Sequence, residues 1–384
     1  MSSHPGYPSH PGHHALLPCP SHDEGARQTF VRDLRTHLAV EVFPGNRLAY
    51  AHRVEPAFHK HNKRTPKDRH EIRKAMAHDS YYQMWSAMQR NSQELMWDSV
   101  VDTVERALPD LIATPQPGNA KGSLTLDVDL SMPDYLTSYD IHLQPGGYHS
   151  EVCAQDIAAG AVYDGGLPIY AMDSLGPLND DLGWTTVECY QEHFPGRKPA
   201  RVLDLGCSVG HSTLPWSEAF PDADVHAIDV GAPLLRYGHG RAEALGRSAH
   251  FSQQNAEQTN FEAGSFDVIV SHFFMHETSR KALPRVFAEC RRLLSPGGVM
   301  LHLDLEQDRD LDPLTSFLME WEVYNNNESF MGQLRSLDLE ALAVEAGFAE
   351  AKVKRIQQPS RASSDQTGDG YVNFFTWPIL TASV

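Results

Sequence analysis

Cysteine is scarce in this sequence, and long apolar runs are absent. The 384 residues include 5 cysteines, scattered along the chain without a CxxC spacing. This pattern argues against a disulfide framework or a structural zinc site and is typical of proteins in a reducing cytoplasm. No apolar run reaches about 18 residues, so the sequence predicts no transmembrane helix. The N-terminal residues also lack the apolar segment of a signal peptide, and we predict a cytoplasmic protein without membrane contact.

Positive charge is also scarce. The chain has 32 Lys and Arg residues against 50 Asp and Glu residues, which gives a formal net charge of −18. Affinity for nucleic acids depends largely on neutralising phosphates, so we predict no nucleic-acid partner. The only basic run extends from His59 to Lys74, and because acidic residues interrupt it we interpret it as a solvated face.

The first 26 residues are rich in His, Pro, Gly and Ser. Such a segment cannot bury enough apolar surface to fold, so we predict a disordered tail over residues 1–26. Its histidines could collect a transition metal in solution, although a plain tail is the favoured interpretation. These histidines are His4, His10, His13, His14 and His22.

Residues 27–195 are predicted to form a helical N-terminal domain that also supplies a lid or substrate-binding part. Thr65-Pro66 resembles a helix start, and apolar residues recur at helical spacing from Ile72 to Leu108. This pattern predicts one long helix, or two helices broken near residues 90–92, ending at Leu108-Pro109. The apolar stripe predicts core packing or a homodimer face.

A segment dense in Gly, Pro, Asp and Tyr follows, from residue 113 to about 183. It contains one strand-like stretch, LTLDVDL, and little other periodicity. Because long irregular segments in compact proteins are usually functional or disordered, and its aromatic residues argue against disorder, we predict a wall or lid of the active site. A helix is expected over residues 182–194, and PGRKP is predicted to be the linker to the next domain.

From Arg201 onward, short apolar strands alternate with helical stretches. Regular alternation of this kind predicts an α/β fold with a doubly wound, mostly parallel sheet. We expect seven strands in a Rossmann-like arrangement over residues 196–384. The sequences of the first five are ARVLDLG, DVHAIDV, AHFSQQNA, FDVIVSHF and GGVMLHLDL, and two more follow near the C-terminus.

A glycine-rich motif follows the first of these strands. Asp204, Gly206 and Gly210 form a D-x-G-x-x-x-G pattern. Glycines at a strand-to-helix turn let the backbone approach a ligand closely, and the helix N-terminus offers free N–H groups. An acid two residues before the first glycine suits a cationic or amino-bearing ligand. Ser208 stands where a dinucleotide fingerprint needs its second glycine, which disfavours a nicotinamide-dependent oxidoreductase.

Two further polar positions lie at the ends of the next strands. Asp229 ends the second strand, where an acid accepts hydrogen bonds from ribose hydroxyls. Asn255-Ala256 follows the third strand, where a polar side chain and a backbone N–H could bind an adenine edge. Cys207 in the glycine motif and Ser271 at the end of the fourth strand complete the predicted cofactor-binding set.

Together these motifs resemble the class I S-adenosylmethionine-dependent methyltransferases that act on small molecules. The resemblance covers residues 200–306: VLDLGCSVG matches the family's glycine-rich motif, Asp229 its ribose-binding acid, and LLSPGGVMLHLD its approach to the fifth strand. Asn255 stands where the family usually has Asp. The resemblance implies S-adenosyl-L-methionine as cofactor and methyl transfer to a small-molecule acceptor. O-methylation is slightly favoured, with N-, S- and C-methylation left open.

Catalytic groups are expected above the ends of the fourth and fifth strands. His272 and His276 are the candidate bases, because a neutral imidazole near pH 7 can take a proton from a hydroxyl or an amine. Glu277 is interpreted as a helix-start residue. We predict no metal site, because His272 and His276 lack a third ligand in the sequence.

Residues 311–331 are predicted to be an insertion after the fifth strand that covers the substrate. Together with the N-terminal segment, it supplies the predicted substrate-binding residues, which are Tyr139, Tyr148, Tyr163, Glu320 and Tyr324. Tyrosines suit a pocket that excludes water yet forms hydrogen bonds.

Two alternative functions remain open from the sequence. A protein of this fold could bind S-adenosylmethionine or its product without transferring a methyl group. It could also methylate a protein, although the acidic composition and the predicted lid favour a small acceptor.

Overall fold

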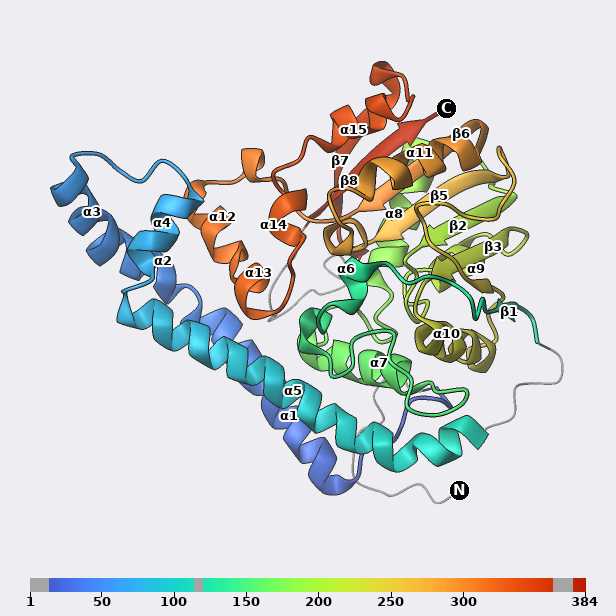
Figure 1. Cartoon of the computed structure of the whole chain (residues 1–384), viewed down its shortest axis with the longest axis horizontal. Helices are drawn as coiled ribbons and strands as arrows, with labels where there is room; N and C mark the ends of the chain where they lie inside the picture. The colour runs from blue at the N-terminus through green and yellow to red at the C-terminus, as the bar shows by residue number, and fades with distance from the viewer. Residues whose placement is uncertain (1–13, 114–119, 362–375) are drawn as a thin grey trace.

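The computed structural model describes residues 14–113, 120–361 and 376–384 (Figure 1). Residues 1–13 of the predicted tail lie outside these ranges. Part of the predicted tail, before the boundary at residue 27, is folded: His14 is buried, and α1 (His22–His37) starts with a capping box between Ser21 and Glu24. None of the described helices is both long and apolar enough to span a membrane.

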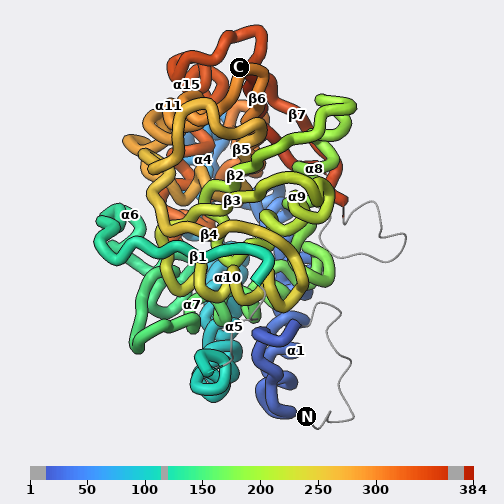
Figure 2. The backbone as a smooth tube through the Cα atoms, turned by 90° about the vertical axis from the view of Figure 1, so that its right-hand side faces the viewer, coloured from blue at the N-terminus to red at the C-terminus, as the bar shows by residue number. Residues whose placement is uncertain are grey.

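In the described part of the chain, seven strands of the C-terminal half and one strand of the N-terminal half form an eight-stranded sheet in the order β1-β4-β3-β2-β5-β6-β8-β7. Figure 2 shows the central strands side by side in this order. Strands β1 to β6 pair in parallel, and β8 runs antiparallel to both of its neighbours. The predicted α/β, doubly wound, mostly parallel fold is confirmed. The strands are β1 (Ser123–Thr125), β2 (Arg201–Leu205), β3 (Asp224–Asp229), β4 (His250–Gln253), β5 (Phe266–His272), β6 (Leu294–Leu303), β7 (Val353–Pro359) and β8 (Thr376–Ser383).

The strand sequences are almost continuously apolar because helices cover both faces of the sheet. Leu203 and Leu205 of β2 pack in the core under α11 (Leu283–Leu293) and α15 (Leu339–Glu345). Val202 packs on the opposite face, under α8 (Asp181–His193) and α9 (Leu214–Ala219). Since successive side chains of a strand point to opposite faces, both cores use residues of the same strands.

The eighth strand is β1, which lies outside the predicted C-terminal domain. It comes from the strand-like stretch LTLDVDL, but only residues 123–125 pair, in parallel with β4. We predicted seven strands, and the structure has one more among the described residues. The additional edge strand, β1, belongs to the N-terminal segment, where no strand of this sheet was expected.

The N-terminal half is helical and is dominated by α5 (Ser80–Ala113), which lies beside α1 along one side of the molecule (Figure 1). The predicted helix does break, but at residues 77–79 rather than at 90–92. Asp79 Oδ1 accepts a hydrogen bond from the N–H of Tyr81 at 3.0 Å, which starts α5 after the shorter α4 (Arg69–Met76). Pro109 lies inside α5 rather than ending it.

The apolar stripe of α5 is only partly buried. Met96 and Val100 are in the core, whereas Met88 and Leu95 are exposed. A homodimer face on this helix stays a prediction.

Two segments connect the helical half to the sheet. One is α7 (Ala158–Tyr170), which contacts both α5 and α10 (Ala232–Ala244). The other is the insertion after β6, whose first helix contacts α4. The remaining α-helices are α2 (Gly45–Ala49), α3 (Glu55–Asn62), α6 (Asp134–Thr137), α12 (Pro313–Met319), α13 (Trp321–Asn325) and α14 (Met331–Leu334). Short π-helical turns cover Leu38–Val42 and Tyr50–Val54, and 3-10 turns cover Ile141–Leu143, Met275–Glu277, Asp308–Asp310 and Glu350–Lys352.

Candidate active site

A cavity of about 580 Å³ lies at the carboxyl edge of β2, β3 and β5. Its walls also include residues from α5, α7 and the insertion after β6, so both halves of the chain contribute. The predicted site residues that line it are Asp204, Gly206, Cys207, Asp229, Asn255, Ala256, His272, His276, Tyr148 and Tyr163.

The turn after β2 needs glycine at its first position. Gly206 has φ +67°, and a Cβ atom placed there would lie 2.4 Å from Cδ2 of Phe274. A side chain would therefore strain the backbone and displace a ring from the cavity wall. Gly210 also has a positive φ, but it faces Phe251 in the core and does not line the cavity.

Asp204 presents an unsatisfied carboxylate oxygen at the start of this turn. Its Oδ2 accepts a hydrogen bond from Thr213 Oγ1 at 2.5 Å. Its Oδ1 is buried without a hydrogen-bond partner and lies 3.3 Å from Nδ1 of His272. A buried carboxylate oxygen in this state favours a ligand that brings a hydrogen-bond donor, above all a cationic one.

Asp229 lies at the end of β3 on the cavity wall. Its carboxylate accepts hydrogen bonds from the N–H groups of Ser208 at 2.9 Å and Gly231 at 2.8 Å. Burial disfavours the ionised form and raises the pKa of Asp229 to about 6. These two bonds fix the carboxylate beside the glycine-rich turn, where it can accept hydrogen bonds from a ligand.

The two predicted bases have different surroundings. Nε2 of His272 is 2.8 Å from Oγ1 of Thr186, so this ring is held between Thr186 and Asp204. His276 instead belongs to a cluster that borders the cavity. Ser271, beside His272, turns away from the cavity and hydrogen-bonds His302 at 2.7 Å.

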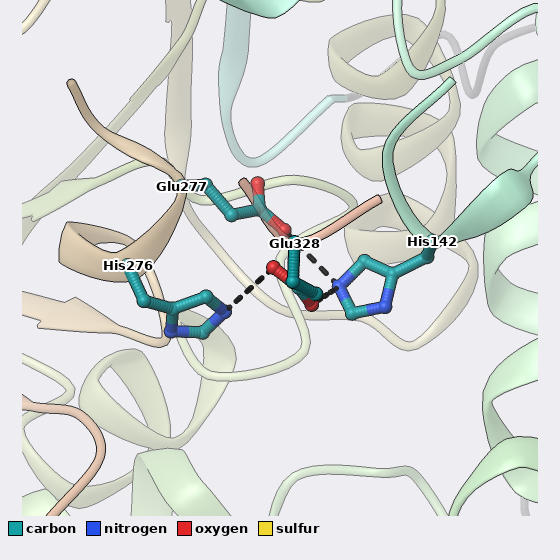
Figure 3. Close-up of side chains that lie close together, drawn as sticks. All are labelled: His142, His276, Glu277 and Glu328. Carbon is teal, nitrogen blue, oxygen red and sulfur yellow. Dashed lines mark ion pairs between the residues drawn. The ribbon is translucent and has the colours of Figure 1, made fainter. Parts of the chain in front are cut away.

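The cluster contains His142, His276, Glu277 and Glu328, whose side chains converge from three separate segments (Figure 3). Nε2 of His142 lies 2.7 Å from Oε1 of Glu328 and 3.3 Å from Oε1 of Glu277. Nε2 of His276 lies 3.8 Å from Oε2 of Glu328. We call these four residues the His–Glu cluster.

The carboxylates around the His–Glu cluster raise the pKa of both imidazoles. Burial opposes protonation of His276, but the nearby carboxylates of Asp304 and Glu328 outweigh it and raise its pKa to about 9. Burial also opposes protonation of His142, yet Glu328 and Glu277 raise its pKa well above the ordinary value. Both rings are therefore cationic near neutral pH when no other cation is bound, which makes them poor proton acceptors.

Comparison with known proteins identifies the family. A methyltransferase-domain family model matches residues 202–298. An uncharacterized methyltransferase of Synechocystis sp. is 30% identical over 157 residues, which cover 40% of this chain and 68% of that protein. The chain belongs to the class I S-adenosylmethionine-dependent methyltransferases. S-Adenosylmethionine is accordingly its methyl donor.

A second curated relative of this methyltransferase is the ubiquinone/menaquinone biosynthesis C-methyltransferase of Vibrio campbellii. It is 30% identical over 190 residues, which cover 44% of this chain and 70% of the relative. Among solved structures, phosphoethanolamine N-methyltransferase 2 of Haemonchus contortus in complex with S-adenosyl-L-methionine is 17% identical, with a TM-score of 0.37. That match covers 52% of each chain.

Three predicted substrate-binding residues of the methyltransferase lie outside the cavity lining. Glu320 forms ion pairs with Arg69 and Arg73, and the guanidinium of Arg73 lies 3.6 Å above the ring of Tyr324. Tyr139 is half-buried beside the cavity but does not line it. Arg69 and Arg73 of α4 thus contact residues of the insertion that do not line the cavity.

Three residues of the His–Glu cluster, His142, Glu277 and Glu328, are not in the predicted set of catalytic and substrate-binding residues. Glu328 follows three asparagines in the insertion, a polar run that suggests a loop and carries no periodic signal. Glu277 was interpreted as a helix-start residue, whereas it is the last residue of the 3-10 turn after β5. The only sequence signal that pointed to Glu328 is its place in residues 311–331, the insertion that was predicted to cover the substrate.

Proposed function

We propose that this methyltransferase transfers its methyl group to a small molecule bound in the cavity. The observation that carries the proposal is the cavity itself, which extends from the glycine-rich turn to the His–Glu cluster. Its volume of about 580 Å³ falls within the range of about 300–1,000 Å³ that is typical of small-ligand sites. A protein side chain would have to enter a space walled by α5, α7 and the insertion.

The residues around Gly206 fit S-adenosylmethionine. Oδ1 of Asp204, which lacks a partner, would accept a hydrogen bond from the ammonium group. Asp229 would bind the ribose hydroxyls, and Asn255 with Ala256 would border the adenine. Cys207 lines the same wall, whereas Gly210 would act by shaping the turn. The cofactor supplies the activated methyl group, and these residues orient it.

The acceptor would occupy the part of the cavity that the His–Glu cluster borders. Tyr148 and Tyr163 form part of that wall, with ring centroids 5.7 Å apart, and Tyr163 stacks on His211. A few polar groups in a largely aromatic wall fix the orientation of a small ligand. The carboxylates of Glu277 and Glu328 favour an acceptor hydroxyl, which supports O-methylation. The acceptor oxygen would bond to the methyl carbon while the carbon–sulfur bond breaks, and the hydroxyl proton would pass to the carboxylate of Glu277 or Glu328.

A labelling experiment tests both the class of acceptor and the acceptor atom. The enzyme is incubated with S-adenosylmethionine carrying a ¹³C methyl group and with a cell extract divided into small molecules and macromolecules. We expect label in the small-molecule fraction, with a methyl carbon shift characteristic of an O-methyl group. Gly206→Arg, which blocks the turn, is the inactive control. Label confined to protein would overturn the proposal, and an N- or S-methyl shift would overturn the choice of acceptor atom.

A further inference from the structure

We propose that the His–Glu cluster binds one divalent transition-metal ion at the acceptor end of the cavity. This inference rests on the proposed function for the role of the ion, but not for its binding. The proposal departs from the sequence prediction of no metal site, which was made without His142 and Glu328.

The geometry of the cluster suits a single ion. His142, His276, Glu277 and Glu328 each offer one ligand atom, and the four atoms lie within 4.8 Å of one another. Zinc, for example, lies about 2.0–2.2 Å from His nitrogens and carboxylate oxygens, so ligands of one ion are roughly 3–4 Å apart. Only small side-chain movements would close the four atoms around an ion.

The two carboxylates of the His–Glu cluster suit binding of a divalent cation. Among the described residues, the ion pairs recorded for Glu277 and Glu328 join them only to the two imidazoles, and no Lys or Arg takes part. Glu328 is 4% exposed, and its Oε2 is buried without a hydrogen bond. Without a metal, the two protonated imidazoles balance these carboxylates. A divalent ion would take over that role while the two rings release their protons.

The two imidazoles also have the outer hydrogen bonds that are usual for metal-binding histidines. Nδ1 of His276 lies 2.8 Å from Oδ1 of Asp304, which directs Nε2 toward Glu328. Asp304 is itself fixed, because its Oδ2 accepts from the N–H of Met275 at 2.9 Å. A carboxylate–histidine pair of this kind orients the ring and makes its free nitrogen a better ligand.

His142 has a comparable partner in Asn326. The amide nitrogen of Asn326 lies 3.1 Å from Nδ1 of His142, while its Oδ1 is buried without a hydrogen bond. Turning the amide by 180° would give Oδ1 the N–H of the ring and leave Nε2 free to bind an ion. It exchanges the hydrogen bond that the amide nitrogen donates to Oε2 of Glu322 at 2.8 Å for one donated by protonated Glu322, whose pKa is raised by burial.

The ligand set narrows the choice of ion and of acceptor. Two imidazoles with two carboxylates suit Mn²⁺, Fe²⁺, Co²⁺ or Zn²⁺ better than Ca²⁺ or Mg²⁺, which prefer oxygen alone. A six-coordinate ion held by four side chains keeps two positions for other ligands. An acceptor with two adjacent oxygen atoms could fill both, and the ion would make its hydroxyl group more acidic before methyl transfer.

The test measures metal binding directly on the full chain. The histidines of the tail would bind ions too, so His4, His10 and His13 are first replaced by Ser in every protein used. The chelator-treated protein is titrated with Co²⁺, followed by visible absorption, and with Mn²⁺, followed by electron paramagnetic resonance. We expect one saturable site, and displacement of Co²⁺ by Zn²⁺.

Substitutions in the His–Glu cluster test whether the ion binds there. Glu328→Gln and His142→Gln should each lower the affinity for Co²⁺ at least tenfold, and Glu277→Gln serves as the mildest change because its side chain is 21% exposed. His250→Gln and Glu151→Gln, at exposed ion pairs elsewhere, should leave the affinity unchanged. Circular dichroism and binding of S-adenosylhomocysteine show whether each variant is folded.

The outcomes separate this inference from the proposed function. No saturable binding by the parent protein, or equal binding by the cluster variants and the controls, would mean that the His–Glu cluster is an ion-pair network alone. Methyl transfer that survives chelation unchanged would remove the catalytic role of the ion but leave the small-molecule function intact. One bound ion without any methylated small molecule would support the site and overturn the function.

Discussion

Gly206 and Gly264 have nearly the same φ angle and very different surroundings. Their φ angles are +67° and +68°, but a Cβ at Gly206 would meet Phe274 at 2.4 Å, whereas one at Gly264 meets nothing within 4 Å. Substitutions at these two glycines therefore distinguish the effect of backbone strain, present at both, from the effect of a collision with Phe274, present only at Gly206.

Replacing either glycine by Ala adds the strain of a left-handed backbone, about 1–2 kcal/mol. Gly264→Ala should lower the unfolding free energy by that amount and leave the affinity for S-adenosylhomocysteine unchanged. Gly206→Ala should be more destabilising and should also weaken the affinity more than tenfold, because Phe274 must move. Urea unfolding and calorimetric titration measure the two effects. Equal affinities in the two variants would show that the turn does not carry the cofactor.

Asp229 should make cofactor binding depend on pH. Its pKa is raised to about 6, so the carboxylate loses its charge as the pH falls through that value. The affinity for S-adenosylhomocysteine should accordingly fall between about pH 7 and pH 5, because a neutral carboxyl group is a weaker acceptor. Asp229→Asn should lower the affinity at pH 8 by about 1–3 kcal/mol and flatten the profile. An unchanged pH profile in this variant would assign the dependence to another group.

The raised pKa of Asp229 makes the stability of the fold depend on pH in the opposite direction to cofactor binding. Because the folded pKa of Asp229 exceeds its unfolded value of 3.8, the folded state holds the proton more tightly. The stability that Asp229 contributes is complete below about pH 4 and is lost as the pH rises through about 6. Binding and stability thus place opposite demands on this side chain, as is common for groups that serve ligands.

At the level of secondary structure, the sequence predicted the C-terminal half far better than the N-terminal half. The five predicted strands from β2 to β6 occur at the expected positions, because buried parallel strands leave short apolar runs that are easy to recognise. The N-terminal helices depend on distant partners: the break before α5 is set by a cap at Asp79. In the same way, Asp204 and Asp229 follow from a local motif, whereas His142 and Glu328 meet only through tertiary contacts.

The insertion after β6 is attached to the N-terminal helices by a buried group of charges. Nε of Arg69 lies 2.5 Å from Oε1 of Glu320, Arg73 pairs with the other oxygen, and the Glu320 side chain is 4% exposed. This contact fixes one wall of the cavity, since the neighbouring Trp321 lines it. Glu320 therefore holds the insertion against α4. Its contact with substrate stays a prediction.

Glu320→Gln should lower the unfolding free energy by about 3–5 kcal/mol, because it leaves two partly buried guanidinium groups without their charge partner. Glu340→Gln is the matched control, since its pairing with Arg309 is more exposed than the Glu320 pairs and should be worth less than about 1 kcal/mol. Chemical denaturation of both variants measures the difference. Unchanged stability together with a raised KM for the acceptor would restore Glu320 as a substrate residue.

For the molecule as a whole, the two predicted domains share one core. Met96 and Val100 of α5 pack in the same cluster as Ile169 of α7 and as Val209 and Tyr237 of the sheet domain. A shared core of this kind couples the unfolding of the parts that build it. The domain boundary at residue 195 stays a prediction, and the shared core predicts that the parts on its two sides unfold together.

The buried carboxylate of Asp164 also forms hydrogen bonds with residues on both sides of the predicted domain boundary. Asp164 of α7 accepts hydrogen bonds from His14 at 2.8 Å, from His211 at 2.6 Å and from the Tyr237 hydroxyl at 2.8 Å. Burial opposes its ionisation, but His211 and His14 outweigh it and hold the pKa of Asp164 well below its usual range. The stability it contributes is present above the unfolded pKa and is lost as the pH falls through the folded one.

Asp164→Asn should therefore destabilise the whole molecule and not one half of it. We expect a loss of about 3 kcal/mol, the order found when one partner of a buried charged group is removed. Far-ultraviolet circular dichroism follows the helices, and tryptophan fluorescence follows both halves, because Trp97 lies in α5 and Trp216 in α9. The two signals should give a single coincident transition in the parent protein and in the variant, shifted to lower denaturant in the variant. If the helical half lost its structure first while the sheet domain kept its parent midpoint, the cavity would lie between two separable domains, and Asp164 would stabilise only one of them.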